Sequence, residues 1–152
     1  MLTDDVQMLI DESVLCWLAT CTPQGEPNVS PKEIFAAHDG SVIIANIMSP
    51  DSARNIRDNR RACVSFINIF TQRGFKVAGA ANVLQPVDDA YADAETALLA
   101  MTGGHYPFKT IFRIEAEKVR PIVAPRYRLF PETTEAVQID SAMHTYGVRP
   151  VT

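Results

Sequence analysis

Hydrophobic positions along the chain fall mostly into short runs of β-branched, aliphatic and aromatic residues, separated by polar turns rich in glycine, proline and aspartate. Runs of this length and composition are typical of β-strands. Because most of the intervening turns are short, we expect neighbouring strands to be antiparallel. A small closed barrel is the expected arrangement because closure removes the sheet edges, although periodicity alone does not distinguish a barrel from a sandwich. The six predicted strands are residues 14–20, 28–37, 41–47, 61–70, 75–87 and 110–124.

Three segments carry helical signals instead. Residues 4–14 place most of their apolar side chains near one face. Residues 49–59 begin with Ser49 and Pro50, which suit an N-cap and a first helical position. Residues 88–104 begin with acids and end in Gly-Gly, which favours a helix with a defined C-terminus. The fold class is therefore mainly β with flanking helices.

The end of the chain has no clear pattern. Residues 132–143 are compatible with a short strand or a helix, and the tail over 126–152 is also compatible with an extended segment along a neighbour. Within the strand at 75–87, Gly79 predicts either a bulge or a close approach of another backbone. Because no repeat, linker or low-complexity tract interrupts the sequence, we expect a single domain over 1–152.

Composition and charge narrow the function classes. The 152 residues are 47% hydrophobic and 21% charged, which suits a soluble domain with a core of useful size. The net charge of −4 argues against a nucleic-acid partner or an anionic membrane surface. No stretch approaches the roughly 20 apolar residues that span a bilayer, and the acidic start of the chain does not resemble a signal peptide.

The cysteines point to a reducing compartment. Cys16, Cys21 and Cys63 are odd in number and lack CxxC spacing, so they predict free thiols rather than a disulfide framework or a zinc site. We therefore expect a cytoplasmic protein with no bound metal.

One segment carries most of the candidate chemistry. At residues 44–61 a hydrophobic strand leads into a helix whose first turn offers unpaired amides and the hydroxyls of Ser49 and Ser52. Arg54 follows, and Lys32 can approach from the preceding strand. Free amides, the positive end of the helix dipole and nearby cations predict an anion site suited to a phosphate group. The alternative is that Ser49 only caps the helix and Arg54 is a solvated surface charge.

A second polar segment surrounds a glycine between two strands. At residues 70–79, Gln72, Arg73 and Lys76 are placed to turn toward a bound planar ligand, or else to solvate an ordinary hairpin. Nucleophilic catalysis has little support, because no GxSxG elbow occurs. His105 follows a Gly-Gly break and either faces a pocket or ends a loop. No catalytic acid or base is assigned.

Four motifs in this order resemble the pyridoxamine 5′-phosphate oxidase-like flavoproteins, the FMN-binding split-barrel family. They are WLATCTPQGEPNVSPKE, DGSVIIANI, SARNIRDNRRACVSF and RGFKVAGAANVL. The resemblance runs from about residue 5 to residue 125 and implies a split β-barrel that binds FMN. It also implies a homodimer with FMN at the subunit interface and hydride transfer with a small-molecule substrate.

The resemblance also nominates cofactor-binding residues by position. It implies that the strand with Ser30 and Lys32 lies along the flavin, and that the next strand places main-chain groups beside the ring. It implies that the start of the helix at 49–59 binds the phosphate, and that the loop within 70–79 reaches the cofactor from the other subunit. The nominated residues are Ser30, Lys32, Ile44, Ala45, Asn46, Ser49, Ser52, Ala53, Arg54, Asn55, Gln72, Arg73 and Lys76.

The chain also departs from the oxidases proper. Asp51 and Ser52 stand where those enzymes carry basic phosphate ligands, so Arg54 and Lys32 must supply the charge. The only tryptophan is Trp17, and the tail lacks the expected tryptophan and arginines, so oxidation of pyridoxamine phosphate itself is not expected. The alternatives are a flavin-binding module without turnover, the same barrel with a deazaflavin or haem, and a structural dimer with an empty groove.

Overall fold

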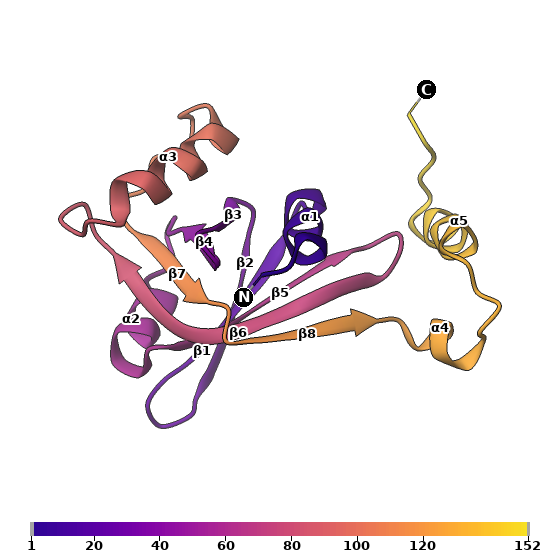
Figure 1. The fold of residues 1–152 in the computed structure, drawn as a ribbon, viewed down its shortest axis with the longest axis horizontal. Coiled ribbons are helices and arrows are strands. Elements are labelled where there is room, and N and C mark those ends of the chain that lie inside the picture. Colours follow the sequence, from indigo (N-terminus) through magenta and orange to yellow (C-terminus); the bar gives the residue numbers. More distant parts are fainter. Residues whose placement is uncertain (1, 152) are drawn as a thin grey trace.

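The computed structural model describes residues 2–151 and arranges them as an antiparallel sheet with flanking helices (Figure 1). The strands are β1 (Cys16–Cys21), β2 (Pro27–Lys32), β3 (Phe35–His38), β4 (Ser41–Ala45), β5 (Arg61–Asn68), β6 (Arg73–Leu84), β7 (Ile111–Glu115) and β8 (Lys118–Val123). The helices are α1 (Asp4–Glu12), α2 (Pro50–Asn59), α3 (Tyr91–Thr102), α4 (Pro125–Leu129) and α5 (Glu135–Tyr146).

The long strand β6 organises the sheet. The strands follow the order β2-β1-β5-β6-β7-β4-β3, and β8 also pairs with β6. The first part of β6 pairs with β5 and β8, and its last four residues pair with β7. Every pairing is antiparallel, as the short turns predict. The predicted fold class, mainly β and antiparallel with flanking helices, is confirmed. No ladder joins β2 to β3 among the described residues, so the sheet is open and the expectation that it closes is wrong.

The structure has eight strands rather than six because two of the predicted strands are broken. The segment predicted at 28–37 divides into β2 and β3, and the segment predicted at 110–124 divides into β7 and β8. Between β7 and β8 the chain turns tightly, with the Glu117 amide donating to the Glu115 carbonyl over 3.0 Å. Each break lets the chain leave one part of the sheet and join another, which a pattern of alternation does not reveal.

Gly79 lies where the partner of β6 changes from β8 to β7. A Cβ atom built on this glycine would lie only 1.9 Å from the backbone oxygen of Glu115. The close approach predicted from the sequence is therefore confirmed, and the absence of a side chain at Gly79 is what allows the turn from β7 to β8 to cross β6.

Strand β4 is buried on both faces, because two hydrophobic clusters meet there. On one side Val42 and Ile44 pack in a core with Phe112 and with helices α1 and α2. On the other side Ile43 packs under helix α3, in a cluster that includes Leu98. This double burial fixes the path of the chain as it leaves β4 and enters α2.

The tail is helical, so the helix alternative at 132–143 is confirmed. Figure 1 shows α4 and α5 extending beyond the sheet, near the turn between β5 and β6. The Tyr127 hydroxyl donates to the Thr71 carbonyl over 2.8 Å, and the rings of Phe70 and Tyr146 meet edge to face. The tail therefore packs on the β5–β6 turn rather than on the core.

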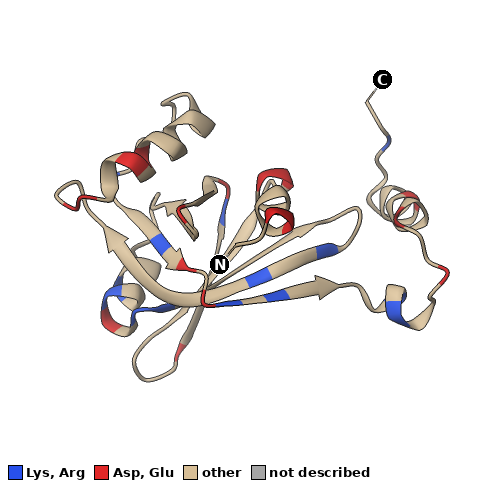
Figure 2. Cartoon of the chain, viewed as in Figure 1, with Lys and Arg blue, Asp and Glu red and all other residues tan. Residues whose placement is uncertain are grey.

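Charge is unevenly distributed despite the negative net charge. Figure 2 shows acidic residues on α1 and basic residues on β6 and β8. Lys76 of β6 lies directly opposite Arg120 of β8. No helix in the described part of the chain is long and apolar enough to cross a membrane.

Gly79→Ala tests the crossing at β6. We expect a loss of at least about 3 kcal/mol in the free energy of unfolding, because the new methyl group meets backbone rather than a flexible side chain. Gly25→Ala is the control, since its φ of +88° strains an alanine but no heavy atom lies within 4 Å, and it should cost about 1–2 kcal/mol. Urea unfolding followed by circular dichroism measures both, and a smaller loss at Gly79 than at Gly25 would contradict this account.

Candidate functional site

The side-chain ammonium of Lys32 lies almost out of contact with water at the end of β2. Only 7% of the residue is exposed. Its Nζ donates hydrogen bonds to Ser30 Oγ and, over 2.5 Å, to Ser49 Oγ. These bonds connect the second strand to the residue that precedes α2, so the structure brings together three of the residues nominated from the sequence.

No carboxylate neutralises Lys32. Within residues 2–151 it takes part in no ion pair. Cys16 is its partner across the β1–β2 ladder, but burial raises the pKa of the Cys16 thiol to about 12 against the opposing attraction of Lys32. The thiol is therefore neutral at physiological pH. Burial lowers the pKa of Lys32 itself, and the result is a buried cation that lacks a counter-ion.

The start of α2 is not capped by a side chain. Ser49 occupies the N-cap position, but its hydroxyl bonds Lys32 and the Ile47 carbonyl instead of a helix amide. Pro50 has no amide hydrogen to satisfy. The amides of Asp51 and Ser52 belong to the first helical turn, which has no intrahelical acceptors, so they point outward from the helix end.

Two nominated side chains on α2 serve as anchors. Asn28 Nδ2 donates to Ser52 Oγ over 3.2 Å, and Asn55 Nδ2 donates to Thr20 Oγ1 over 3.1 Å. Both Ser52 and Asn55 are buried. These bonds fix α2 against β1 and β2, and they hold the helix end in place beside Lys32.

Arg54 is already engaged in an ion pair. Its Nη1 lies 3.2 Å from Asp51 Oδ1, and both side chains are 67% exposed. Asp51 places negative charge at the helix end, where it disfavours an anion. The pairing with Arg54 offsets that charge, and both residues line a cavity of about 260 Å³ at this end of α2.

The nominated residues in β4 and just after it have few main-chain amides left to donate a hydrogen bond to a ligand. The Ala45 amide donates to the Ile34 carbonyl and the Asn46 amide donates to the Thr110 carbonyl, each over 3.0 Å. The side chains of Ile44 and Ala53 belong to the hydrophobic core. Asn46 Nδ2 donates to Thr110 Oγ1, while its Oδ1 is buried with no hydrogen-bond partner among the described residues.

A cavity of about 300 Å³ opens beside Lys32, with mostly apolar walls. Ala45 and Ile47 supply one side of it, and Tyr106 reaches it from the loop after α3. His105, the neighbouring residue considered from the sequence, is exposed and does not line this cavity. Tyr106 was missed, and its position in the same Gly-Gly-His-Tyr-Pro stretch was the available signal. The lining residues are Leu15, Pro31, Lys32, Glu33, Ile34, Ala45, Ile47 and Tyr106.

The nominated residues near the β5–β6 turn lie apart from this cavity. Arg73 Nε is 3.2 Å from Glu135 Oε1, and its guanidinium lies 4.3 Å above the ring of Tyr127. Gln72 adopts a left-handed backbone conformation with φ of +53°. Lys76 lies on the same cross-strand row as Pro31 but three strands away, a separation of about 14 Å. One chain therefore does not bring these residues to Lys32.

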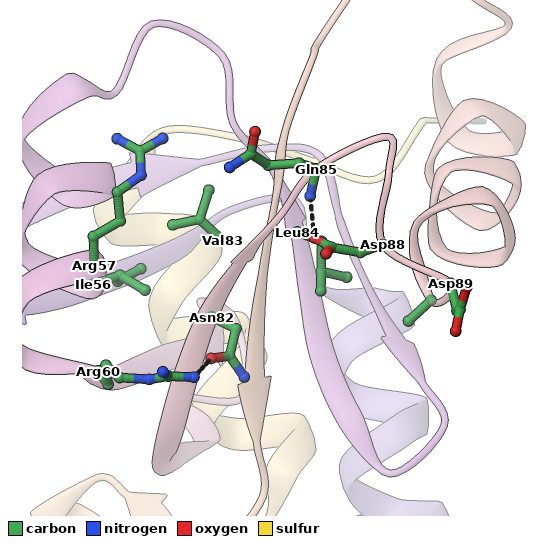
Figure 3. Close-up of a pocket in the computed structure, with 10 residues that line it drawn as sticks. Ile56, Arg57, Arg60, Asn82, Val83, Leu84, Gln85, Asp88 and Asp89 are labelled. Carbon is green, nitrogen blue, oxygen red and sulfur yellow. Dashed lines mark hydrogen bonds between the residues drawn. The ribbon is translucent and has the colours of Figure 1, made fainter.

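A larger cavity lies at the other end of α2 (Figure 3). It measures about 560 Å³ and shares no lining residue with the Lys32 cavity. The sequence did not reveal it, because its charged residues come from two elements that are separated along the chain. One side carries Arg57 of α2 and Arg60 at the C-cap of that helix, and the other carries Asp88 and Asp89 after β6.

Comparisons with known proteins are consistent with the sheet described above. A family model described as pyridoxamine 5′-phosphate oxidase matches residues 2–123. Helices α4 and α5 lie beyond that match. No protein of curated function matches the sequence.

Three similar solved structures differ in what their names say they bind. The haem storage protein HutZ from Vibrio cholerae is 17% identical, with a TM-score of 0.64 over 78% of this chain and 92% of that one. An FMN-binding protein from Syntrophomonas wolfei is 17% identical, with a TM-score of 0.62 over 78% and 84%. An F420 reductase is 18% identical, with a TM-score of 0.60 over 78% and 98%. These likenesses support the fold and leave the ligand to be argued from the site.

Lys32→Met should stabilise the protein at neutral pH, because it removes a buried charge that no anion compensates. The pKa of Lys32 is lower in the folded chain than in the unfolded chain, so the wild-type protein gains stability as pH rises through the interval between the two values. The advantage of Lys32→Met should therefore shrink as pH rises.

Urea unfolding at a series of pH values measures this difference. Lys118→Met, at an exposed lysine of β8, is the matched control and should change stability little at any pH. A Lys32→Met protein that is less stable than wild type at neutral pH would mean that the two serine hydroxyls fully compensate the ammonium.

Proposed function

The chain belongs to the pyridoxamine 5′-phosphate oxidase family, and from this premise we propose that it binds FMN and uses it to oxidise or reduce a small molecule. The observation that carries the proposal is the ammonium of Lys32, buried between two serine hydroxyls and forming no ion pair with a carboxylate of the described residues. A buried cation of this kind is stabilised when a ligand supplies the missing negative charge. FMN carries such a charge on its phosphate.

The residues present fit an FMN molecule in two parts. Lys32, the Ser49 hydroxyl and the outward amides of Asp51 and Ser52 would hold the phosphate, with Arg54 adding charge when it turns from Asp51. The apolar walls of the Lys32 cavity would hold part of the flavin ring. When bound, FMN supplies the hydride-transfer chemistry.

A second copy of the chain is part of the proposal. The Lys32 cavity, at about 300 Å³, lies at the low end of the volumes of small-molecule sites. Gln72, Arg73 and Lys76 do not reach it within one chain. In a homodimer the partner's β5–β6 turn would complete the site and exclude water from it. The chain's own groups would bind and orient the cofactor, and none is assigned as an acid or base.

Haem is the second candidate ligand, because the similar Vibrio cholerae structure is a haem storage protein. A deazaflavin has corresponding support from the F420 reductase. A flavin-binding module without turnover is the third possibility. The absorption spectrum of the purified protein separates haem from flavin, and mass spectrometry of the released ligand identifies which flavin it is.

The phosphate assignment is tested by Arg54→Ala combined with Lys32→Ala. Loss of two charge-assisted contacts should weaken FMN binding by about 2–4 kcal/mol, or roughly 30- to 1,000-fold, in a fluorescence titration. Arg57→Ala, one turn further along α2 and outside both cavities near Lys32, is the matched control and should leave the affinity unchanged. Equal affinity of wild-type and doubly substituted proteins would remove these residues from the site.

Turnover is tested separately on the protein loaded with FMN. An oxidoreductase should lose its flavin absorption when a reduced nicotinamide is added without oxygen, and regain it when an electron acceptor follows. If the protein binds FMN tightly but the flavin remains oxidised with either NADH or NADPH, the protein is a flavin-binding module. The enzymatic part of the proposal would then fail while the binding part stands.

A further inference from the structure

The cavity of about 560 Å³ at the C-terminal end of α2 has a distribution of charge that the FMN proposal does not use. It lies between the last turn of α2, the end of β6 and the loop that leads to α3. Figure 3 shows Arg57 and Arg60 on one side, Asp88 and Asp89 on the other, and aliphatic side chains between them. The volume falls within the range of small-molecule sites.

The basic side has one engaged arginine and one that is free. Arg60 donates a hydrogen bond to Asn82 Oδ1, which holds its guanidinium against β6. The guanidinium of Arg57 makes no hydrogen bond or ion pair with any residue in the part of the chain that the structure describes. Its five donors therefore remain available to an anion.

The acidic side is built in the same way. Asp88 Oδ2 accepts a hydrogen bond from the Gln85 amide over 2.7 Å, so this carboxylate is partly used within its own turn. Asp89 has no hydrogen bond or ion pair among residues 2–151. One arginine and one aspartate thus face the same cavity without partners.

The two sides do not neutralise each other. No ion pair joins Arg57 or Arg60 to Asp88 or Asp89 in the described residues. The acidic loop is held by its own bonds: the Asp88 amide donates to the Gln85 carbonyl, and the Tyr91 amide donates to the Asp88 carbonyl, each over 2.9 Å. The loop is therefore fixed on its own side of the cavity.

Between the charges the cavity is lined by aliphatic side chains. Ile56 and Leu84 are buried beneath it, and Val83 is partly exposed between the two sides. An apolar group placed over Val83 and Leu84 would be removed from water on one face.

We propose that this cavity binds a small zwitterion, with its anionic group at Arg57, its cationic group at Asp89 and an aliphatic group over Val83 and Leu84. A simple anion would be attracted by the arginines but would face two carboxylates across the same cavity, and a simple cation would face the reverse. A ligand with both charges satisfies both sides. A dipeptide with one aliphatic residue has this chemistry and a suitable size.

Three related probes test the proposal. Leucylglycine carries both charges, N-acetyl-leucylglycine lacks the ammonium, and leucylglycine amide lacks the carboxylate. We expect leucylglycine to bind with millimolar affinity, seen as shifts of the backbone NMR signals of residues 82–90. Each capped probe should bind about three- to fivefold more weakly, the loss typical of one exposed ion pair.

Substitutions then assign each charge to its partner. Arg57→Ala should weaken the binding of leucylglycine by a similar factor but leave the binding of leucylglycine amide, which lacks the carboxylate, unchanged. Asp89→Ala should likewise weaken the binding of leucylglycine but leave the binding of N-acetyl-leucylglycine, which lacks the ammonium, unchanged. Arg128→Ala, at an exposed arginine of α4, is the control and should change no affinity. No shift of residues 82–90 with leucylglycine, or equal affinity for all three probes, would overturn the proposal. FMN binding is unaffected by either result, because the cavities share no lining residue.

Discussion

The change of pairing partner along β6 is the constraint on which the rest of the structure depends. One strand pairs with β5 and β8 and then with β7, and this is possible only because Gly79 leaves room for the backbone of Glu115. This change of partner places β4 between two hydrophobic clusters and so fixes where the chain enters α2. A cavity lined by residues of α2 lies at each end of that helix, so both depend on its position.

Near the start of α2 the burial of Lys32 has an unfavourable electrostatic free energy. Burial of an ammonium without a carboxylate disfavours its charged form, and the lowered pKa of Lys32 reflects this. The two hydroxyl partners hold the ammonium in place without cancelling its charge, and the outward amides of the helix start add to the positive potential there. Such an arrangement lowers the stability of the protein without a ligand, which supports the proposal that a bound anion supplies the missing charge.

At the opposite end, the arginines of α2 lie where the helix dipole favours positive charge. At the start, Asp51 lies where the helix dipole favours negative charge, and its ion pair with Arg54 offsets that charge. The helix thus separates two regions of different electrostatic character, a buried single cation and an open cavity with both signs. We therefore propose two chemically different ligands, since the first region holds a buried cation without an ion-pair partner and the second holds unpaired charges of both signs.

The sequence by itself determined the elements that depend on local forces. The helices beginning near Ser49 and Asp88, the antiparallel order of strands and the close approach at Gly79 all follow from caps, turns and steric space, which act over a few residues. Tertiary structure alone decided where the strands divide, that the sheet stays open, and which charges are paired. Lys32 meets Ser49, and Arg73 meets Glu135, because folding brings distant segments together. Contacts through space of this kind leave no periodic trace in one sequence, so neither the counter-ion missing from Lys32 nor the cavity between α2 and β6 was visible before the fold.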